Sequence, residues 1–148
     1  SSTAIRKLLS SGSVQKIPQL LGRKFSLRGN VVSGSKRGHS LGFPTANLSI
    51  KDKLLIPKLG IYATETKIDS KIYPSCTSIG LRPTFYPKNN NPLIETHIIN
   101  YNNNIYDKTI EVFFIDRIRD EKKFTSAQKL IEQMNNDVDK AYRILKSQ

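Results

Sequence analysis

Strand-like runs joined by very short spacers are the feature that most restricts the fold of this chain. Residues 60–68 and 71–73 flank the turn-forming pair Asp69-Ser70, and residues 93–100 and 105–118 flank a short polar stretch. Both pairs are typical of β-hairpins. Such spacers can join antiparallel strands but are too short for a crossover between parallel strands. We therefore expect a mainly β fold, a meander or Greek key that closes most economically into a small barrel.

Helical patterns lie on either side of this strand-rich region. At the N-terminus, Ser2 or Thr3 can cap a helix that Gly12 ends, and Pro18 interrupts a second short helical stretch. Near the C-terminus, a Thr-Ser-Ala-Gln sequence has the pattern of a capping box. Apolar residues then recur at helical spacing, at Leu130, Met134, Val138, Ala141 and Leu145. We expect this amphipathic helix to pack against the barrel.

The composition allows one domain and leaves the kind of anionic partner open. A chain of 148 residues can bury a single core, and its net charge of +12 favours nucleotides, nucleic acid or membrane phosphates as partners. Because Cys76 is the only cysteine, neither an internal disulfide nor a cysteine-based zinc cluster can form, which favours the reducing cytoplasm. No apolar run approaches membrane-spanning length, so we expect no membrane association.

A glycine-rich basic loop is followed directly by a Pro-Thr-Ala-Asn stretch. Gly34, Gly38 and Gly42 are four residues apart, so backbone N–H groups between them could converge on an anion. The spacing matches neither a Walker A loop nor a dinucleotide-binding fingerprint, and a plain flexible connection remains open. Thr45 and Asn47, two apart on an extended backbone, would point to the same side. Their neutral oxygens suit Mg²⁺ when phosphates supply the negative charge, although Asx and Ser/Thr turns use the same residue types.

Glu95 is the strongest candidate for a general base. It lies in the run 93–99, where both faces of the strand carry apolar groups, so the strand should be largely buried. A buried carboxylate is costly unless it is paired or used, and burial raises its pKa toward the range of a useful base. A salt bridge to one of the many Lys or Arg side chains is the alternative. His97, on the same face, fits an orienting or structural residue better than a ligand.

Five stretches, in order along the chain, together resemble the motifs of the riboflavin kinases (flavokinases). They are GSKRGHSLGFPTAN at 34–47, PKLGIYA at 57–63, IGLRPTF at 79–85, IETH at 94–97 and IRDEKKF at 118–124. The resemblance implies a six-stranded antiparallel Greek-key barrel with N-terminal helical segments and a long C-terminal helix. It also implies an activity, the transfer of the γ-phosphoryl group of ATP to the ribityl 5′-hydroxyl of riboflavin. The products would be FMN and ADP, and Mg²⁺ would accompany ATP.

The same resemblance assigns roles to individual residues. Glu95 would accept the proton of the attacking hydroxyl, and Thr45 and Asn47 would hold Mg²⁺. The residues implied for ATP are Gly34, Lys36, Gly38, His39, Ser40, Gly42, Phe43, Pro44 and Thr45. Those implied for the flavin are Thr84, Phe85, Arg119, Glu121 and Phe124. These roles are chemically coherent, because phosphoryl transfer needs positioning, charge neutralisation and a weak general base more than a covalent catalyst.

The N-terminal sequence SSTAIR resembles the end of the nucleotidyltransferase domain that precedes the kinase in bacterial bifunctional FAD synthetases. We therefore expect residues 1–21 to be the end of such a domain and residues 22–148 to be the kinase domain. In a longer protein, an FMN adenylyltransferase domain would be covalently linked to this one. The present chain alone should form FMN and no FAD.

Two other functions are compatible with parts of the sequence. A basic β-barrel could bind single-stranded nucleic acid through charge and exposed aromatic side chains. That hypothesis leaves the Pro-Thr-Ala-Asn stretch and Glu95 unexplained, so nucleic acid is not the favoured partner. The chain could also regulate an adjacent adenylyltransferase without activity of its own, but the presence of Thr45, Asn47 and Glu95 argues against such a remnant.

Overall fold

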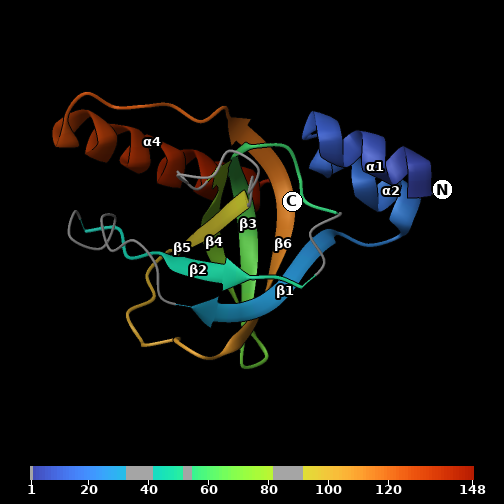
Figure 1. Ribbon diagram of the computed structural model, residues 1–148, viewed down its shortest axis with the longest axis horizontal. Helices are drawn as coiled ribbons and strands as arrows, with labels where there is room; N and C mark the ends of the chain where they lie inside the picture. The colour runs from blue at the N-terminus through green and yellow to red at the C-terminus, as the bar shows by residue number, and fades with distance from the viewer. Residues whose placement is uncertain (1, 33–41, 52–54, 82–91) are drawn as a thin grey trace.

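The computed structural model describes residues 2–32, 42–51, 55–81 and 92–148, and six antiparallel strands form a closed barrel at its centre (Figure 1). The elements are α1 (Ser2–Ser11), a 3₁₀ turn (Val14–Lys16), α2 (Ile17–Leu21), β1 (Phe25–Val32), β2 (Ala46–Ser49), β3 (Gly60–Ile68), β4 (Lys71–Leu81), β5 (Pro92–Ile98), β6 (Thr109–Arg119) and α4 (Ala127–Lys146). Around the barrel the order is β1, β2, β5, β4, β3, β6. Strands β3, β4 and β5 pair in succession, and β6 then returns to pair with β3. This path is a Greek key, so the expected fold class is confirmed.

One of the two predicted hairpins is confirmed and the other is wrong. At the turn between β3 and β4, Asp69 and Ser70 have φ values of 49° and 74°, the signs that a two-residue type I′ turn requires. The runs 93–100 and 105–118 do not pair with each other. Both edges of β5 are taken by β2 and β4, and both edges of β6 are taken by β1 and β3. Closure of the barrel therefore overrides the preference for the nearest strand in the chain.

The inside of the barrel is apolar except for a chain of buried hydroxyl groups that links β3, β4 and β5. Thr77 bonds Thr64 of β3 at 2.8 Å and Thr96 of β5 at 3.0 Å. Ile94, on the same strand as Thr96, is also buried in the core. Since alternate residues of a strand point to opposite faces, Glu95 and His97 point to the outside of the barrel.

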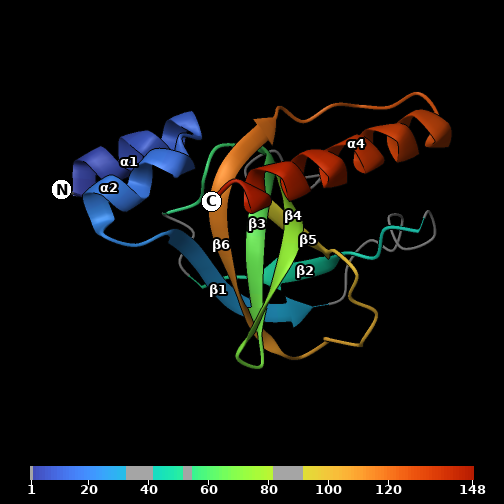
Figure 2. The same cartoon turned by 180° about the vertical axis from the view of Figure 1, so that it is seen from behind.

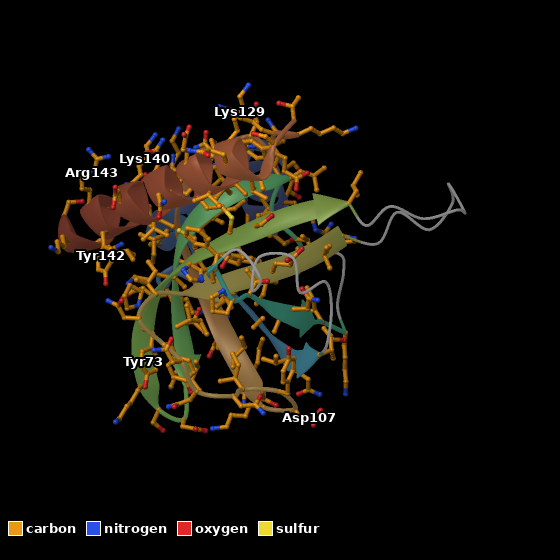
Figure 3. The ribbon with its side chains drawn as sticks, turned by 90° about the vertical axis from the view of Figure 1, so that its left-hand side faces the viewer. Tyr73, Asp107, Lys129, Lys140, Tyr142 and Arg143 are labelled. Atoms are coloured by element: carbon orange, nitrogen blue, oxygen red, sulfur yellow. The ribbon has the colours of Figure 1, made fainter. Side chains whose placement is uncertain are left out.

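Helix α4 covers part of that outer surface, against β3, β4 and β6 (Figure 2). The capping box predicted at residues 125–128 is displaced by one residue, because Ser126 and not Thr125 is the N-cap, and its side chain accepts a hydrogen bond from the Lys129 backbone at 3.2 Å. Ala141 packs with Ala63 and Cys76 of the sheet. The opposite face of α4 carries exposed cationic side chains that point away from the barrel, among them Lys129, Lys140 and Arg143 (Figure 3).

The N-terminal helices pack on a different side of the barrel from α4, beside β6 and β1 (Figure 1). Leu9, Val14 and Ile17 are buried in the same core as the strands. Gly12 ends α1 as predicted, with a φ of 78°, and a Cβ at this position would lie 2.5 Å from Cδ of Arg117. Pro18 does not interrupt a helix, because it lies in the first turn of α2, where a missing N–H is tolerated.

Candidate active site

Pairing between β2 and β5 brings the predicted metal-binding and catalytic residues together. Asn47 lies directly opposite Glu95 in the register, and Thr45 immediately precedes β2. The Thr45 hydroxyl donates a hydrogen bond to Oε2 of Glu95 at 3.2 Å. Three oxygen-bearing side chains from segments about 50 positions apart thus share one face of the β2–β5 pair. The sequence predicted that Thr45 and Asn47 share a side, but only the barrel places that side beside Glu95.

Asn47 is a buried polar side chain whose carbonyl oxygen lacks a partner among the described residues. It is only 4% exposed, and its Oδ1 atom accepts no hydrogen bond from the part of the chain that the structure describes. A buried carbonyl oxygen without a partner costs about 1–3 kcal/mol, so it marks a position where a ligand can supply the missing interaction. Within the described ranges, His, Cys, Asp and Glu form no cluster of three that could hold a metal ion. A cation here would depend on neutral oxygens and on the charge of an anionic ligand.

A cavity of about 650 Å³ opens beside Glu95, on the outside of the barrel and under α4. Its polar side includes Thr45, Glu95 and His97. Its apolar lining is formed by Phe43, Ile61, Leu81, Phe124, Leu130, Met134 and Val138. The size and the combination of an apolar wall with a few polar groups are those of a site for a small organic ligand.

Glu121 lies at the edge of this cavity over Gly80 of β4. A Cβ on Gly80 would lie 2.3 Å from Oε1 of Glu121, so only glycine leaves room for the carboxylate. Burial raises the pKa of the Glu121 carboxyl, and the positive charge of Arg119 opposes that increase. Glu121 is largely exposed, and its carboxyl group adds a hydrogen-bonding group to the wall of the cavity.

Arg119 joins β6 to α4 through a paired interaction with Asp137. Its Nε and Nη2 atoms donate to Oδ1 and Oδ2 of Asp137 at 2.9 and 2.7 Å. Gln133 donates a further hydrogen bond to the same carboxylate at 3.0 Å. Arg119 lines the cavity, but all three of its guanidinium nitrogens already donate hydrogen bonds, because Nη1 bonds the backbone oxygen of Asp120 at 2.9 Å. Its clearest role in the structure is to hold the α4 wall in place.

A second cavity, of about 310 Å³, lies on the other side of Thr45. Its walls are Val31, Pro44, Ala46, Thr96, Ile98 and the connection from Tyr101 to Tyr106. Among the described residues that line these two cavities, Thr45 is the one that borders both. Thr45 therefore marks the place where the two cavities adjoin, and its hydrogen bond to Glu95 lies on the side of the larger cavity.

The structure gathers part of the predicted site and leaves part of it untested. Phe43, Thr45, Glu95, Arg119, Glu121 and Phe124 all border the larger cavity, and Pro44 borders the smaller one. Gly42 is described, with a φ of 89°, but lines neither cavity. Gly34, Lys36, Gly38, His39, Ser40, Thr84 and Phe85 lie outside the described residues. Sequence reasoning missed Asp137 and did not foresee that Leu130, Met134 and Val138 form a ligand-facing wall; their helical spacing indicated only burial.

Comparison with known proteins identifies the family. The family model named Flavokinase, described as riboflavin kinase, matches residues 21–145. The chain belongs to the riboflavin kinase family. It is 36% identical, over 97% of its own length, to a protein of Bacillus subtilis named bifunctional riboflavin kinase/FMN adenylyltransferase. A protein of Buchnera aphidicola with the same name is 38% identical over 94% of the chain. The sequence-based recognition of a riboflavin kinase domain is therefore confirmed.

Solved structures give the same fold. A Streptococcus pneumoniae structure described as a macrolide-efflux protein has a TM-score of 0.86 at 37% identity, covering 93% of this chain and 44% of that one. A riboflavin kinase structure from Trypanosoma brucei has a TM-score of 0.59 at 23% identity, over 82% of this chain and 79% of that one, a likeness of fold alone. None of the relatives named here is described as a nucleic-acid-binding protein.

The chain spans a little less than half the length of these bacterial relatives. It covers 46% of the Bacillus subtilis protein and 45% of the Buchnera aphidicola protein. The match thus covers the kinase module and not the whole of a bifunctional protein. None of the helices in the described ranges combines the length and the apolar character needed to cross a membrane.

Proposed function

We propose that this chain phosphorylates riboflavin with ATP, forming FMN and ADP, and that the transfer takes place between Thr45 and Glu95. The observation that carries the proposal is the position of Thr45 at the border of two cavities, with its hydroxyl bonded to Glu95 of the larger one, in a chain of the riboflavin kinase family. A kinase needs two adjacent substrate sites with a proton acceptor between them. The β2–β5 pair supports that arrangement.

We assign riboflavin to the larger cavity and ATP to the smaller one. The apolar wall that α4 and Phe124 provide suits the planar ring system of a flavin, and Glu121 and Arg119 offer polar groups at its edge. The smaller cavity adjoins Pro44 and Thr45, the described end of the segment expected to bind ATP. The ribityl chain would extend from the larger cavity toward Glu95. The net charge of +12 favours the approach of the anionic nucleotide.

Glu95 would accept the proton of the ribityl 5′-hydroxyl. As this proton leaves, the hydroxyl oxygen would bond to the γ-phosphorus, and the bond between that phosphorus and the ADP oxygen would break. The carboxylate already accepts a hydrogen bond from the Thr45 hydroxyl, so its orientation is restrained before substrate binds. Thr45 and the unpaired Oδ1 of Asn47 would hold Mg²⁺ together with ATP phosphates, and the ion would neutralise charge on those phosphates. Positioning and electrostatics supply most of the catalysis in such reactions.

We further propose that residues 1–21 are the end of an FMN adenylyltransferase domain and residues 22–148 the kinase domain of a longer bifunctional protein. The names and lengths of the bacterial relatives support this division. In the structure, Leu9, Val14 and Ile17 are buried against the barrel, so the N-terminal segment would also serve as a packing surface for the kinase. A cytoplasmic location agrees with the single free cysteine, Cys76, and with the supply of ATP there.

The test is a product assay with riboflavin, ATP and Mg²⁺, followed by chromatographic separation of flavins. We expect FMN and ADP from the wild-type chain. Glu95→Gln should bind both substrates but turn over about 10²–10⁴-fold more slowly, because the proton acceptor has gone. Glu132→Gln, an exposed change on α4, is the matched control and should be as active as wild type. Absence of FMN from wild type would refute the function, and an active Glu95→Gln variant would refute the role of Glu95 alone.

A further inference from the structure

The backbone pairing between β2 and β5 ends just before the residues that would meet ATP. The last paired positions are Ala46 and Thr96. The next positions toward the N-terminus are Thr45 and Pro44, and proline has no N–H with which to continue a ladder. Some other contact must therefore hold this end of the segment against β5 if Thr45 is to keep its place beside Glu95.

The side chain of His97 provides that contact. Its Nδ1 atom lies 2.9 Å from the carbonyl oxygen of Pro44. Because a carbonyl oxygen can only accept, the proton of the ring must be on Nδ1 and the imidazole donates. The same ring meets Phe43 edge to face, with centroids 5.5 Å apart and an interplanar angle of 68°. Phe43 is itself buried, so two consecutive residues before Thr45 are attached to one imidazole.

We propose that His97 is a positioning residue for phosphoryl transfer: it holds the Phe43-Pro44 segment to β5 and thereby keeps Thr45 at Glu95. This inference rests on the proposed kinase function. Glu95 and His97 are two apart on β5 and point to the same face, so the strand that carries the proton acceptor also carries the group that positions the opposite segment. Strand β5 would thus position both the base and the segment that would contact metal and phosphate.

Two substitutions separate this role from a merely structural one. The amide nitrogen of Asn can take the place of Nδ1, so His97→Asn can still donate to Pro44. The longer Gln side chain places its amide near the position of Nε2, so His97→Gln cannot. We expect His97→Asn to keep kcat within about threefold of wild type. We expect His97→Gln to lower kcat about 10- to 100-fold at saturating ATP and riboflavin, because small displacements of reacting groups have effects of that size.

The other kinetic constants distinguish positioning from loss of fold. His97 also lines the larger cavity, so both substitutions can change riboflavin affinity measured by calorimetry, but they should change it to a similar extent, and the melting temperatures of both variants should lie within a few degrees of wild type. A His97→Gln variant with full kcat, or a His97→Asn variant as slow as His97→Gln, would overturn the proposal. A wild-type chain that makes no FMN would instead overturn the proposed function, so the two failures differ.

The tautomer of His97 can be measured in the chain that keeps this histidine, so the result does not depend on how the His97 variants fold. Two-bond ¹H–¹⁵N correlation spectra report which ring nitrogen of a histidine carries the proton. The chain has two histidines, and a His39→Gln sample assigns the signals. We expect the Nδ1–H tautomer for His97, with a slowly exchanging proton. A dominant Nε2–H tautomer would show that the hydrogen bond to Pro44 is absent, and the proposal would then be wrong.

Discussion

The ion pair between Arg119 and Asp137 gives the sharpest test of how α4 is held against the barrel. Asp137 is 5% exposed and the Arg119 side chain 15%, so water screens the pair weakly. Replacing Asp137 with Ala would leave the guanidinium buried without its carboxylate. Loss of one partner of a buried pair typically lowers the free energy of unfolding by about 3–5 kcal/mol. For a chain of this size each kcal/mol corresponds to about 2–4 °C, so the melting temperature should fall by about 6–20 °C.

Denaturation by heat and by urea, followed by circular dichroism, measures both quantities. Asp139→Ala, an exposed change two residues along α4, is the matched control and should alter the free energy of unfolding by less than about 0.5 kcal/mol. The double variant Arg119→Met/Asp137→Leu removes both charges. It should be more stable than Asp137→Ala, because the largest cost is the unpaired charge and not the absent interaction.

The same substitution should weaken riboflavin binding, because Leu130, Met134 and Val138 reach the larger cavity from α4. A loosened helix would raise the KM for riboflavin more than the KM for ATP, because none of the described residues that line the smaller cavity, which we assign to ATP, comes from α4. If the free energy of unfolding of Asp137→Ala lies within about 1 kcal/mol of the wild-type value, the reasoning is refuted. Such a result would mean that the guanidinium of Arg119 is adequately solvated without Asp137.

Three further outcomes are expected. Gly80→Ala should leave the fold intact, because its Cβ would meet only the movable end of Glu121, but it should raise the Kd for riboflavin measured by calorimetry; unchanged affinity would contradict a flavin-side role for Glu121. Burial raises the pKa of the Cys76 thiol to about 12 from an ordinary value of 9.0, so its contribution to stability is complete below pH 9 and is lost as pH rises toward 12. Wild type should therefore lose more stability than Cys76→Ala over that interval, and equal losses would show that the thiol is not buried in solution. Finally, the chain incubated with riboflavin, ATP and Mg²⁺ should form no FAD, and an FAD peak would mean that a second nucleotide site has been overlooked.

Local patterns in the sequence were sufficient for much of the secondary structure and for selecting candidate site residues. The type I′ turn at Asp69-Ser70 and the cap at Ser126 depend on residues close together in the chain, whose conformational preferences act without tertiary context. The same is true of the common side of Thr45 and Asn47, which follows from strand alternation. Glu95 could be selected because a carboxylate in an otherwise apolar strand requires an explanation.

The tertiary structure alone decided which segments meet. The absence of pairing between β5 and β6 followed from closure of the barrel, although the intervening connection suggested a hairpin. The contact between Arg119 and Asp137 spans 18 positions and that between Pro44 and His97 spans 53. Contacts over such separations are selected by the packing of the whole chain, because their loop-closure entropy is repaid only when many of them form together. A sequence therefore indicates which residues are suited to catalysis, whereas the closed barrel determines that a threonine, a glutamate and a histidine lie at the same place.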